Sequence, residues 1–499
     1  MDISDTTNPE SIPKPNSANE TTEKISIPKR RVCLCFGYLG SEFSGLQVNP
    51  GARTVESELE AAIVTAGGIS PVNAGSFTKV GWGRCARTDK GVHATAQIVS
   101  LKMLLSEPDT LVQRINAALP PSIRVFAMLR TTEHFNPKSW CSGRTYRYLI
   151  PTFVFDPSSF ADVSEMYPWA KDENMPLIDD VESDGEGGDD SDDDKPKKRR
   201  KEKTPIEQPP AQATDPGNMS EYFPQKNYPK PYLTHEQSIE YLQTTRKQSS
   251  QFEWSDELSD KVNEVAKRFV GTRNYHNYTT AKAQESWNHC NRVIRKIKCS
   301  KAFTIDGLEM VEVTLDGQSF IYHQIRKMIG AIICVIRGTV PSDFIDLTFS
   351  ERAVPVPLAP SVGLFLDRCH FDQYNKKFAG DSAHPQLIFN QPEIESFVTS
   401  SIHPHIAHSL PEWFLPWLES TERVYPSKLE KALAQPAPPL NPQKIPRLKA
   451  RERELALIAK SHIPKKKDDA PFTASKESDI PFSDLPQKTK RQESTQSED

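Results

Sequence analysis

Residues 83–94 read GRCARTDKGVHA, and the interpretation of the whole chain depends on this stretch. It brings two arginines, an aspartate, a lysine and a histidine into twelve residues, and an alternating apolar run follows at once. An aspartate before Lys-Gly is by itself typical of a turn, because its short side chain caps the local backbone and glycine adopts positive φ easily. A catalytic loop is the alternative, and the rest of the sequence decides between the two.

The sequence around this stretch predicts strands and amphipathic helices. Apolar side chains alternate in three segments that we expect to be strands: residues 31–36, 94–103 and 145–150. A helix is expected from Thr54, a suitable N-cap, and another over residues 111–119, where two prolines follow. These elements make residues 29–155 a first predicted lobe.

A second predicted lobe covers residues 231–378. Ser255 begins a helix with apolar residues at helical spacing, and residues 325–336 form another with a buried apolar stripe. Arg326 and Lys327 lie near the start of this second helix, off that stripe. Strands are expected over residues 293–298 and 310–315. The dipeptide Asp316-Gly317 then predicts a hairpin turn into a strand at residues 320–322.

The fold class that follows is α+β. We expect two lobes, each with a mostly antiparallel sheet covered by helices, and a catalytic cleft between them. Three segments fall outside the lobes: a disordered N-terminal tail (1–28), a low-complexity insertion (156–230) and a Pro- and Lys-rich C-terminal extension (379–499). The extension contains an apolar patch around Trp413 and Trp417, which either docks a partner or packs on the core.

Composition narrows the class of protein. The net charge is −4, but the two predicted lobes are net positive, which suits a polyanionic partner. The eight cysteines form no CxxC pair, which indicates a reduced, intracellular protein. The first 23 residues lack the apolar core of a signal peptide, and the longest apolar run is too short to span a bilayer. We expect a soluble protein without a membrane partner.

Seven sequence blocks of the chain resemble those of a known family. Residues 83–94 are similar to the catalytic signature of the TruA-type tRNA pseudouridine synthases, and six further blocks follow the family order. They are FGYLGSEFSGLQ (36–47), NAALP (116–120), RTYRY (144–148), GTRNYHNYT (271–279), YHQIRKMIG (322–330) and APSVGLFL (359–366). The insertion, the extension and HQIRKMIG resemble the eukaryotic, fungal branch named tRNA pseudouridine synthase 1.

The resemblance implies a reaction and three catalytic residues. Uridine is converted to pseudouridine without a consumed cofactor. Asp89 takes the position of the essential carboxylate, as nucleophile or as base, because loss of uracil leaves an electron-poor sugar carbon. Arg87 would hold Asp89 in an ion pair. Tyr146 would stack on the flipped uracil, and its hydroxyl would assist proton transfer.

Further residues are expected to bind the substrate. Leu364 would form an apolar wall of the uracil pocket, with plain core packing as the alternative. Basic side chains in or near the family blocks are candidates for phosphate contacts, and each of them alone would also suit a solvated surface: Arg84, Lys90, Arg144, Arg147, Arg326 and Lys327. Tyr275, His276 and Tyr278 would either stack on RNA bases or join sheets by apolar contact. His93 and His323 lack a third ligand at useful spacing, so no metal is assigned.

The implied substrate is tRNA in its anticodon stem-loop region, with small nuclear RNA and mRNA as further substrates. The alternative from another class is a non-catalytic RNA-binding or tRNA-folding protein on the same scaffold, which would be expected to lose Asp89. A nucleoside hydrolase is a third, disfavoured reading. The basic run at residues 195–203 resembles a nuclear localisation signal, which predicts an import receptor as partner and a nuclear protein. The oligomeric state is left between a monomer and a weak homodimer.

Overall fold

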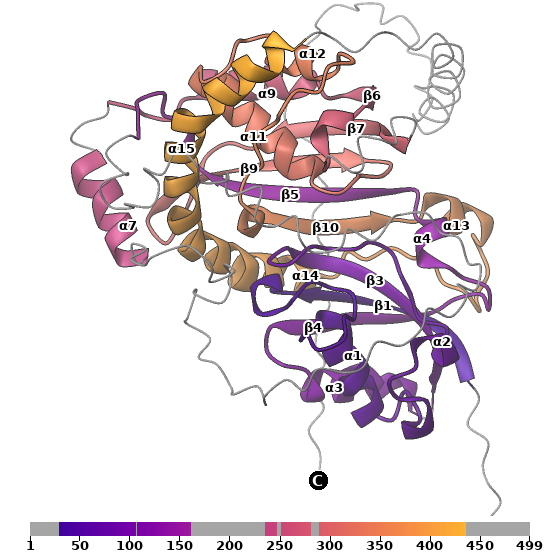
Figure 1. The fold of residues 1–499 in the computed structure, drawn as a ribbon. Helices are drawn as coiled ribbons and strands as arrows, with labels where there is room; N and C mark the ends of the chain where they lie inside the picture. Colours follow the sequence, from indigo (N-terminus) through magenta and orange to yellow (C-terminus); the bar gives the residue numbers. More distant parts are fainter. Residues whose placement is uncertain (1–28, 106, 161–234, 247–250, 281–288, 436–499) are drawn as a thin grey trace, which may run out of the picture.

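One ten-stranded sheet forms the centre of the protein. The computed structural model describes residues 29–105, 107–160, 235–246, 251–280 and 289–435 (Figure 1). The strands follow the order β4-β1-β3-β10-β5-β9-β7-β6, with β2 paired to β3 and β8 paired to β9 at the sides of this path. Nearly all neighbours are antiparallel, and the α+β class is confirmed.

The first half of the sheet is built from the N-terminal part of the chain. β1 (Lys29–Tyr38) pairs on one side with β3 (His93–Leu104) and on the other with β4 (Ile123–Arg130), both antiparallel. The short β2 (Gly83–Arg84) extends the pairing of β3. α1 (Val55–Thr65) and α3 (Pro108–Ala118) cover this half, and Thr54 caps α1 through a reciprocal bond with Ser57 as predicted (Figure 1).

The second half of the sheet contains β5 (Gly143–Pro151), β9 (Leu308–Gly317), β7 (Asn291–Cys299) and β6 (Gly271–Asn274), with β8 (Phe303–Ile305) at the side. α9 (Asp256–Lys267) and α11 (Gln324–Arg337) lie on this half (Figure 1). Ser255 caps α9 by accepting the Leu258 N–H, as the sequence predicts. Shorter helices complete the described part: α2 (Phe77–Val80), α4 (Pro137–Trp140), α7 (His235–Tyr241), α12 (Phe344–Thr348) and α13 (Asp372–Lys377).

β10 (Leu364–His370) joins the two halves into one sheet. It pairs in parallel with β3, where Phe365 lies opposite His93, and antiparallel with β5, where Leu366 lies opposite Tyr146. The two separate sheets expected from the sequence are therefore one continuous sheet. The reason is that β5, from the first predicted lobe, also pairs with β9 of the second.

The hairpin predicted after Asp316-Gly317 is absent from the described residues, so that prediction is wrong. Residues 320–322 lead into α11 instead of forming a strand. The Gln324 side chain accepts the Ile321 N–H at 3.0 Å, and the Gln324 N–H bonds to the Ile321 carbonyl at 3.1 Å. His323 takes the left-handed conformation, with φ of 66°, to make this sharp entry into the helix.

The C-terminal extension packs on the core over its described part. α14 (Pro392–Phe397), a π-helical turn (Val398–Ile402) and α15 (His403–Ala434) run along one side of the molecule past both halves of the sheet (Figure 1). α15 contains three internal prolines, which lack an N–H, so its stability must come from packing. The Trp417 indole donates to the Leu358 carbonyl at 2.8 Å, and Phe414, Leu415 and Leu418 are buried. The apolar patch therefore packs on the core.

Several sequence predictions lie outside the described residues. These are the N-terminal tail, most of the insertion with its basic run at 195–203, and the part of the extension from residue 436 onward. Among the described helices, none combines the length and the apolar character needed to cross a membrane.

Replacing Trp417 should destabilise the protein strongly. Trp417 is 3 % exposed and its indole N–H is bonded, so Trp417→Ala leaves a large cavity and an unpaired carbonyl. We expect the free energy of unfolding to fall by about 3 to 5 kcal/mol. Urea denaturation followed by circular dichroism measures it, with Trp413→Ala, at a partly buried position of the same helix, as the control. Equal effects of the two substitutions would contradict the packing role of Trp417.

Candidate active site

Two loops meet where β3 and β10 begin. Because these strands are parallel and His93 lies opposite Phe365, the segments that precede them lie at the same edge of the sheet. A Cβ atom added at Gly91 would lie 3.2 Å from Ser361 Oγ, which shows how closely the signature loop approaches the segment before β10. The pairing thus brings residues 83–94 and residues 359–366, far apart in sequence, to one place.

The signature loop is held from several directions. The hydroxyl of Tyr38 in β1 forms a buried 2.6 Å hydrogen bond with Thr88 Oγ1. The Thr88 carbonyl accepts the Leu46 N–H at 3.3 Å, and the Asp89 carbonyl accepts the Val92 N–H at 3.2 Å. Gly91 closes the turn with φ of 79°, a conformation that favours glycine. The loop is therefore a rigid turn that presents Asp89, a partly exposed residue, at the sheet edge.

Tyr146 lies in the middle of the sheet beside this loop. It sits in β5 between Leu366 of β10 and Leu315 of β9, and it is 7 % exposed. Burial raises the pKa of Tyr146 far above its usual value, the charge of Arg144 lowers it in part, and the charge of Asp89 adds a smaller increase. The carboxylate and the phenol are therefore within electrostatic reach of each other. Phe320 packs edge-on against the Tyr146 ring, with centroids 5.2 Å apart.

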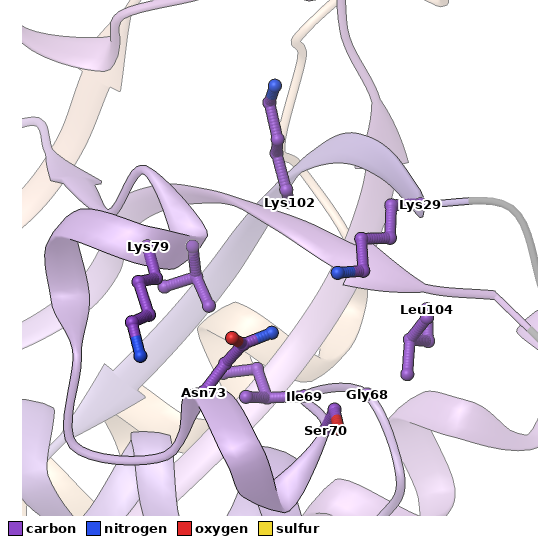
Figure 2. Close-up of a pocket in the computed structure, with 9 residues that line it drawn as sticks. Lys29, Gly68, Ile69, Ser70, Asn73, Lys79, Lys102 and Leu104 are labelled. Carbon is purple, nitrogen blue, oxygen red and sulfur yellow. The ribbon is translucent and has the colours of Figure 1, made fainter.

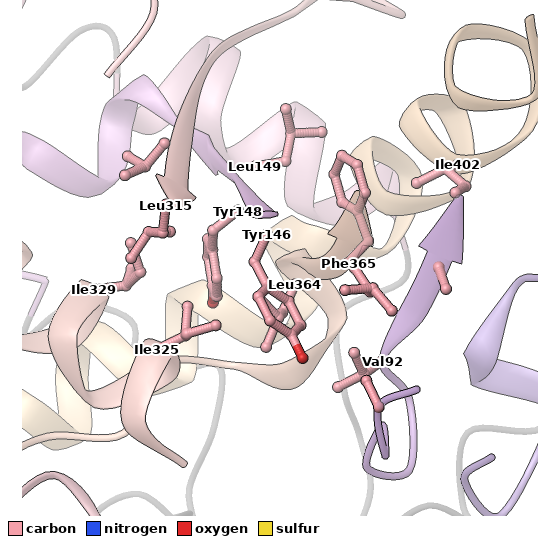
Figure 3. Packing of buried hydrophobic residues seen from close by; sticks show 14 of the residues in the cluster. Val92, Tyr146, Tyr148, Leu149, Leu315, Ile325, Ile329, Leu364, Phe365 and Ile402 are labelled. Atoms are coloured by element: carbon pink, nitrogen blue, oxygen red, sulfur yellow. The ribbon is translucent and has the colours of Figure 1, made fainter. Parts of the chain in front are cut away.

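Leu364 of β10 lies on the same face of the sheet as Tyr146 and Tyr148 of β5. It is 6 % exposed and pairs in register with Tyr148, while Figure 3 shows its side chain beside Tyr146. The Tyr148 hydroxyl donates to the Pro360 carbonyl and the ring is fully buried. Tyr148 is thus a core residue, and Leu364 combines core packing with proximity to Tyr146.

The structure places Arg87 and Lys90 on the surface of the signature loop, where both are exposed. This placement is compatible with contacts to an RNA backbone, because phosphate contacts are made by accessible cations. The Arg87–Asp89 ion pair and the phosphate contact of Lys90 stay predictions.

Arg84 has a structural role. Its guanidinium forms two bonds with the Glu56 carboxylate, Nε to Oε1 at 2.7 Å and an η nitrogen to Oε2 at 2.8 Å. The Glu56 side chain is fully buried in α1 and also accepts the Trp82 indole N–H at 2.8 Å. This bidentate pair fixes the start of the signature on α1, so the placement of Arg84 gives no support to the predicted phosphate contact.

Arg326 and Lys327 also bond to the protein itself. Arg326 is 3 % exposed and its Nε donates to the Ala359 carbonyl at 2.7 Å, although the helical spacing placed it off the buried stripe. The Lys327 ammonium donates to the Thr279 carbonyl at 2.8 Å. Both side chains tie α11 to neighbouring segments, and their predicted phosphate contacts gain no support from these positions.

Two basic residues of β5 differ in their surroundings. Arg144 donates to the Cys85 carbonyl at 2.6 Å, next to the signature loop. Arg147 lies among three carboxylates, with Asp367 at 2.7 Å, Glu395 at 3.4 Å and Glu312 at 3.8 Å. This acidic environment disfavours a phosphate near Arg147, since the anion would meet three negative charges.

The aromatic block at residues 275–278 forms a buried cluster. Tyr275 and Tyr278 are fully buried and pack with Phe269 and Phe349 at centroid distances between 5.4 and 5.9 Å. The Tyr278 hydroxyl is hydrogen-bonded to Thr348 Oγ1 at 2.6 Å. Of the two alternatives for these aromatics, the structure favours apolar contact over stacking on RNA bases.

Comparison with known proteins assigns the chain to a family. A family model described as tRNA pseudouridine synthase matches residues 265–372. Over 398 residues the chain is 34% identical to tRNA pseudouridine synthase 1 of Yarrowia lipolytica, covering 77% of this chain and 72% of that protein. The chain belongs to the tRNA pseudouridine synthase family. The resemblance stated from the sequence motifs, including the fungal branch, is confirmed.

Two further relatives support the assignment of this chain to the synthase family. It is 30% identical over 431 residues to tRNA pseudouridine synthase 1 of Schizosaccharomyces pombe, covering 76% of this chain and 79% of that protein. It is 30% identical over 380 residues to human pseudouridylate synthase 1 homolog, covering 75% of this chain and 68% of that protein. The alignments extend well beyond the block that the family model matches.

Sequence reasoning missed several residues of this site. Phe320, which packs on Tyr146, was assigned to a strand that does not form, and Tyr38 gave no signal that it would hold Thr88. A cluster of three thiols, from Cys85, Cys141 and Cys369, also went unrecognised, although their sulfurs lie within 4.8 Å of one another. These cysteines are far apart in sequence. The pairing of β5 and β10 brings Cys369 near Cys141, and the bond from Arg144 to the Cys85 carbonyl holds Cys85 beside them.

A cavity lies away from this site. Lys29, Lys79 and Lys102 surround it, with Asn73 and Ser70 at its floor (Figure 2). Lys102 is paired with Glu133 at 3.3 Å, which offsets part of the positive charge. The cavity lies where β1 begins and β3 ends, and the residues that line it are outside the family motifs.

The Glu56–Arg84 pair yields a test of its structural role. Glu56→Ala removes a buried carboxylate and leaves the Arg84 guanidinium and the Trp82 N–H without their acceptor. We expect a loss of about 3 to 5 kcal/mol in the free energy of unfolding. The matched control is Glu58→Ala in the same helix, whose partner Arg53 is half exposed, with an expected loss below about 1 kcal/mol. Similar losses in chemical denaturation would contradict the assignment.

Proposed function

We propose that this synthase isomerises uridine to pseudouridine in tRNA and that Asp89 is its essential carboxylate. The observation that supports it is the placement of Asp89. A rigid loop presents this carboxylate beside the buried Tyr146, at the point where β10 joins the two halves of the sheet. The family supplies the reaction class, and this geometry supports Asp89 and Tyr146 as the residues that would carry it.

The reaction requires a charge near the sugar and an apolar surface near the base. The bond between uracil N1 and the ribose C1′ breaks, the base turns, and C5 bonds to C1′ while the C5 proton leaves and N1 gains a proton. The Asp89 carboxylate would stabilise the electron-poor sugar carbon, either by adding to it or by removing a proton. Substrate and product contain the same atoms, so no cofactor is consumed.

Tyr146 would act as a neutral phenol. Because burial holds its pKa far above the usual value, the hydroxyl stays protonated throughout the neutral and mildly alkaline range. A protonated phenol can donate a hydrogen bond to the base or pass on a proton, and its ring offers a stacking surface. Leu364 and Phe320 would form the apolar sides of the pocket that receives the flipped uracil.

The finer assignments are also proposals. The target uridines lie in the anticodon stem-loop region, and small nuclear RNA and mRNA are further substrates, as the family resemblance implies. The basic run at 195–203 is typical of an import signal, which supports a nuclear protein that binds an import receptor. The enzyme acts as a monomer or a weak homodimer. The non-catalytic alternative gains no support, since Asp89 is retained and rigidly presented.

Asp89→Asn should abolish catalysis and preserve RNA binding. The substitution keeps the shape of the side chain and removes its charge, so the sugar carbon loses its stabilising carboxylate. We expect no tritium release from tRNA transcripts labelled at uracil C5, with affinity for the tRNA unchanged in a filter-binding assay. Asp109→Asn, at an exposed position in α3, is the control and should match the wild type. Release by the Asp89 variant at the wild-type rate would refute the proposal.

Tyr146→Phe separates the ring from the hydroxyl. The ring stays in place and the proton donor is lost, so we expect turnover to fall by about 10²- to 10⁴-fold with little change in tRNA affinity. The wild-type rate should show no tyrosine ionisation up to about pH 9, because the raised pKa keeps the phenol protonated there. Tyr148→Phe, a core position, should retain turnover. Full activity of Tyr146→Phe would contradict a role of the hydroxyl in catalysis and would leave stacking of the ring on the base as the only contribution of Tyr146.

A further inference from the structure

Three thiols gather behind the active site. Cys85 follows β2, Cys141 precedes β5 and Cys369 lies in β10, and all three sulfurs are within 4.8 Å of one another. Cys85 is 1 % exposed and Cys369 is 7 % exposed, whereas Cys141 is partly exposed. The cluster therefore contains one partly exposed cysteine, with two buried thiols within 4.8 Å of its sulfur.

The surroundings of the cluster favour a thiolate at Cys141. Hydrogen bonds from the Cys369 and Cys85 thiols lower the pKa of Cys141 well below its usual range, and the positive charge of Arg144 lowers it further. Arg144 is held in place by its 2.6 Å bond to the Cys85 carbonyl. An accessible thiolate beside a guanidinium, with a second thiol in reach, is the arrangement found at oxidation-sensitive cysteines.

The same guanidinium argues against a bound cation. Structural zinc takes four ligands in a tetrahedron, and the cluster offers three sulfurs. In the part of the chain that the structure describes, no histidine or carboxylate joins these sulfurs as a fourth ligand. A divalent ion there would also face the charge of Arg144, whereas a thiolate is stabilised by it.

The cluster is linked to the catalytic tyrosine through β5. Arg144 precedes Tyr146 by two residues, and Cys369 lies opposite Arg144 in the register of β10 with β5. All three cysteines are free thiols, so a disulfide, in which the sulfurs lie about 2 Å apart, requires two of the sulfurs to move together. Because Cys141 lies two residues before β5, such a movement would act on the start of the strand that carries Tyr146.

We propose that Cys141 is an oxidation site that forms a reversible disulfide with Cys369 or Cys85 and thereby lowers the activity of the enzyme. The oxidant is a peroxide. The Cys141 thiolate attacks one peroxide oxygen, the O–O bond breaks, and hydroxide leaves, which gives a sulfenic acid at Cys141. The neighbouring thiol then attacks this sulfur, and the disulfide forms with release of water. A dithiol reductant reverses the reaction.

The test treats the full-length enzyme with hydrogen peroxide and maps the cysteines by mass spectrometry after alkylation. We expect a disulfide between Cys141 and one of the two buried partners, a loss of tritium release of about ten- to hundredfold, and recovery with dithiothreitol. Cys141→Ser keeps a donor for the Gly143 carbonyl, which the thiol contacts at 3.1 Å, and should keep basal activity and resist peroxide. Cys290→Ser, outside the cluster, should remain as sensitive as the wild type.

Three results would overturn the proposal. Cys141 could stay reduced under peroxide that oxidises other cysteines, or the Cys141→Ser enzyme could lose activity as the wild type does. The purified protein could also contain one equivalent of a divalent metal that Cys141→Ser releases. The activity arm rests on the proposed function, whereas the disulfide map does not. An enzyme without tritium release that still forms the disulfide would therefore refute the function and keep the oxidation site.

Discussion

The pairing of β10 with β3 is the constraint on which the active site depends. A strand from residues 364–370 enters the sheet beside a strand from residues 93–104, in parallel, with Phe365 opposite His93. Parallel pairing places the loops before both strands at the same edge. Asp89 in one loop and Leu364 after the other thus come together, while the antiparallel pairing with β5 adds Tyr146. Without β10 the two halves of the sheet would carry these residues separately.

The charged side chains around this junction differ in burial and in their bonding partners. Glu56, Arg84 and Arg326 are bonded within the protein, and their partners fix the segments that frame Asp89. Burying a charged side chain costs free energy unless the charge is paired. A buried, paired charge therefore fixes the position of protein segments and contributes little to binding a substrate. Arg87 and Lys90 are exposed on the signature loop, and their contact with an RNA backbone stays a prediction. Basic residues of one motif therefore differ in burial and in their surroundings.

The sequence predicted local structure well and long-range structure poorly. β1, β3 and β5 follow from alternation of apolar side chains, and the caps at Thr54 and Ser255 follow from side-chain chemistry. Nothing local predicts that β10 pairs with β3, because that contact joins segments about 270 residues apart in sequence. The thiol cluster and the approach of Phe320 to Tyr146 were missed for the same reason.

Two of the errors have local physical causes. The Asp316-Gly317 hairpin rested on a dipeptide that favours a turn, but the left-handed His323 and the Gln324 side chain instead start α11 directly. Arg326 was placed off the apolar stripe by helical periodicity, which describes one helix against one surface. α11 is covered on more than one side, since the segment at Ala359 lies against it as well, and the off-stripe arginine is buried there.

The extension belongs to the catalytic unit because α15 bonds to segments that adjoin both loops around Asp89. A 2.7 Å hydrogen bond joins His405 Nε2 to Ser41 Oγ, in the segment that also supplies Leu46 to the Thr88 carbonyl. Twelve residues further along, the Trp417 indole holds the Leu358 carbonyl, directly before the segment that leads into β10. One helix thus fixes the two segments whose relative position decides where Asp89 meets Leu364. The packing of α15 must offset the hydrogen bonds lost at its three internal prolines, and the same packing stabilises the arrangement of the site.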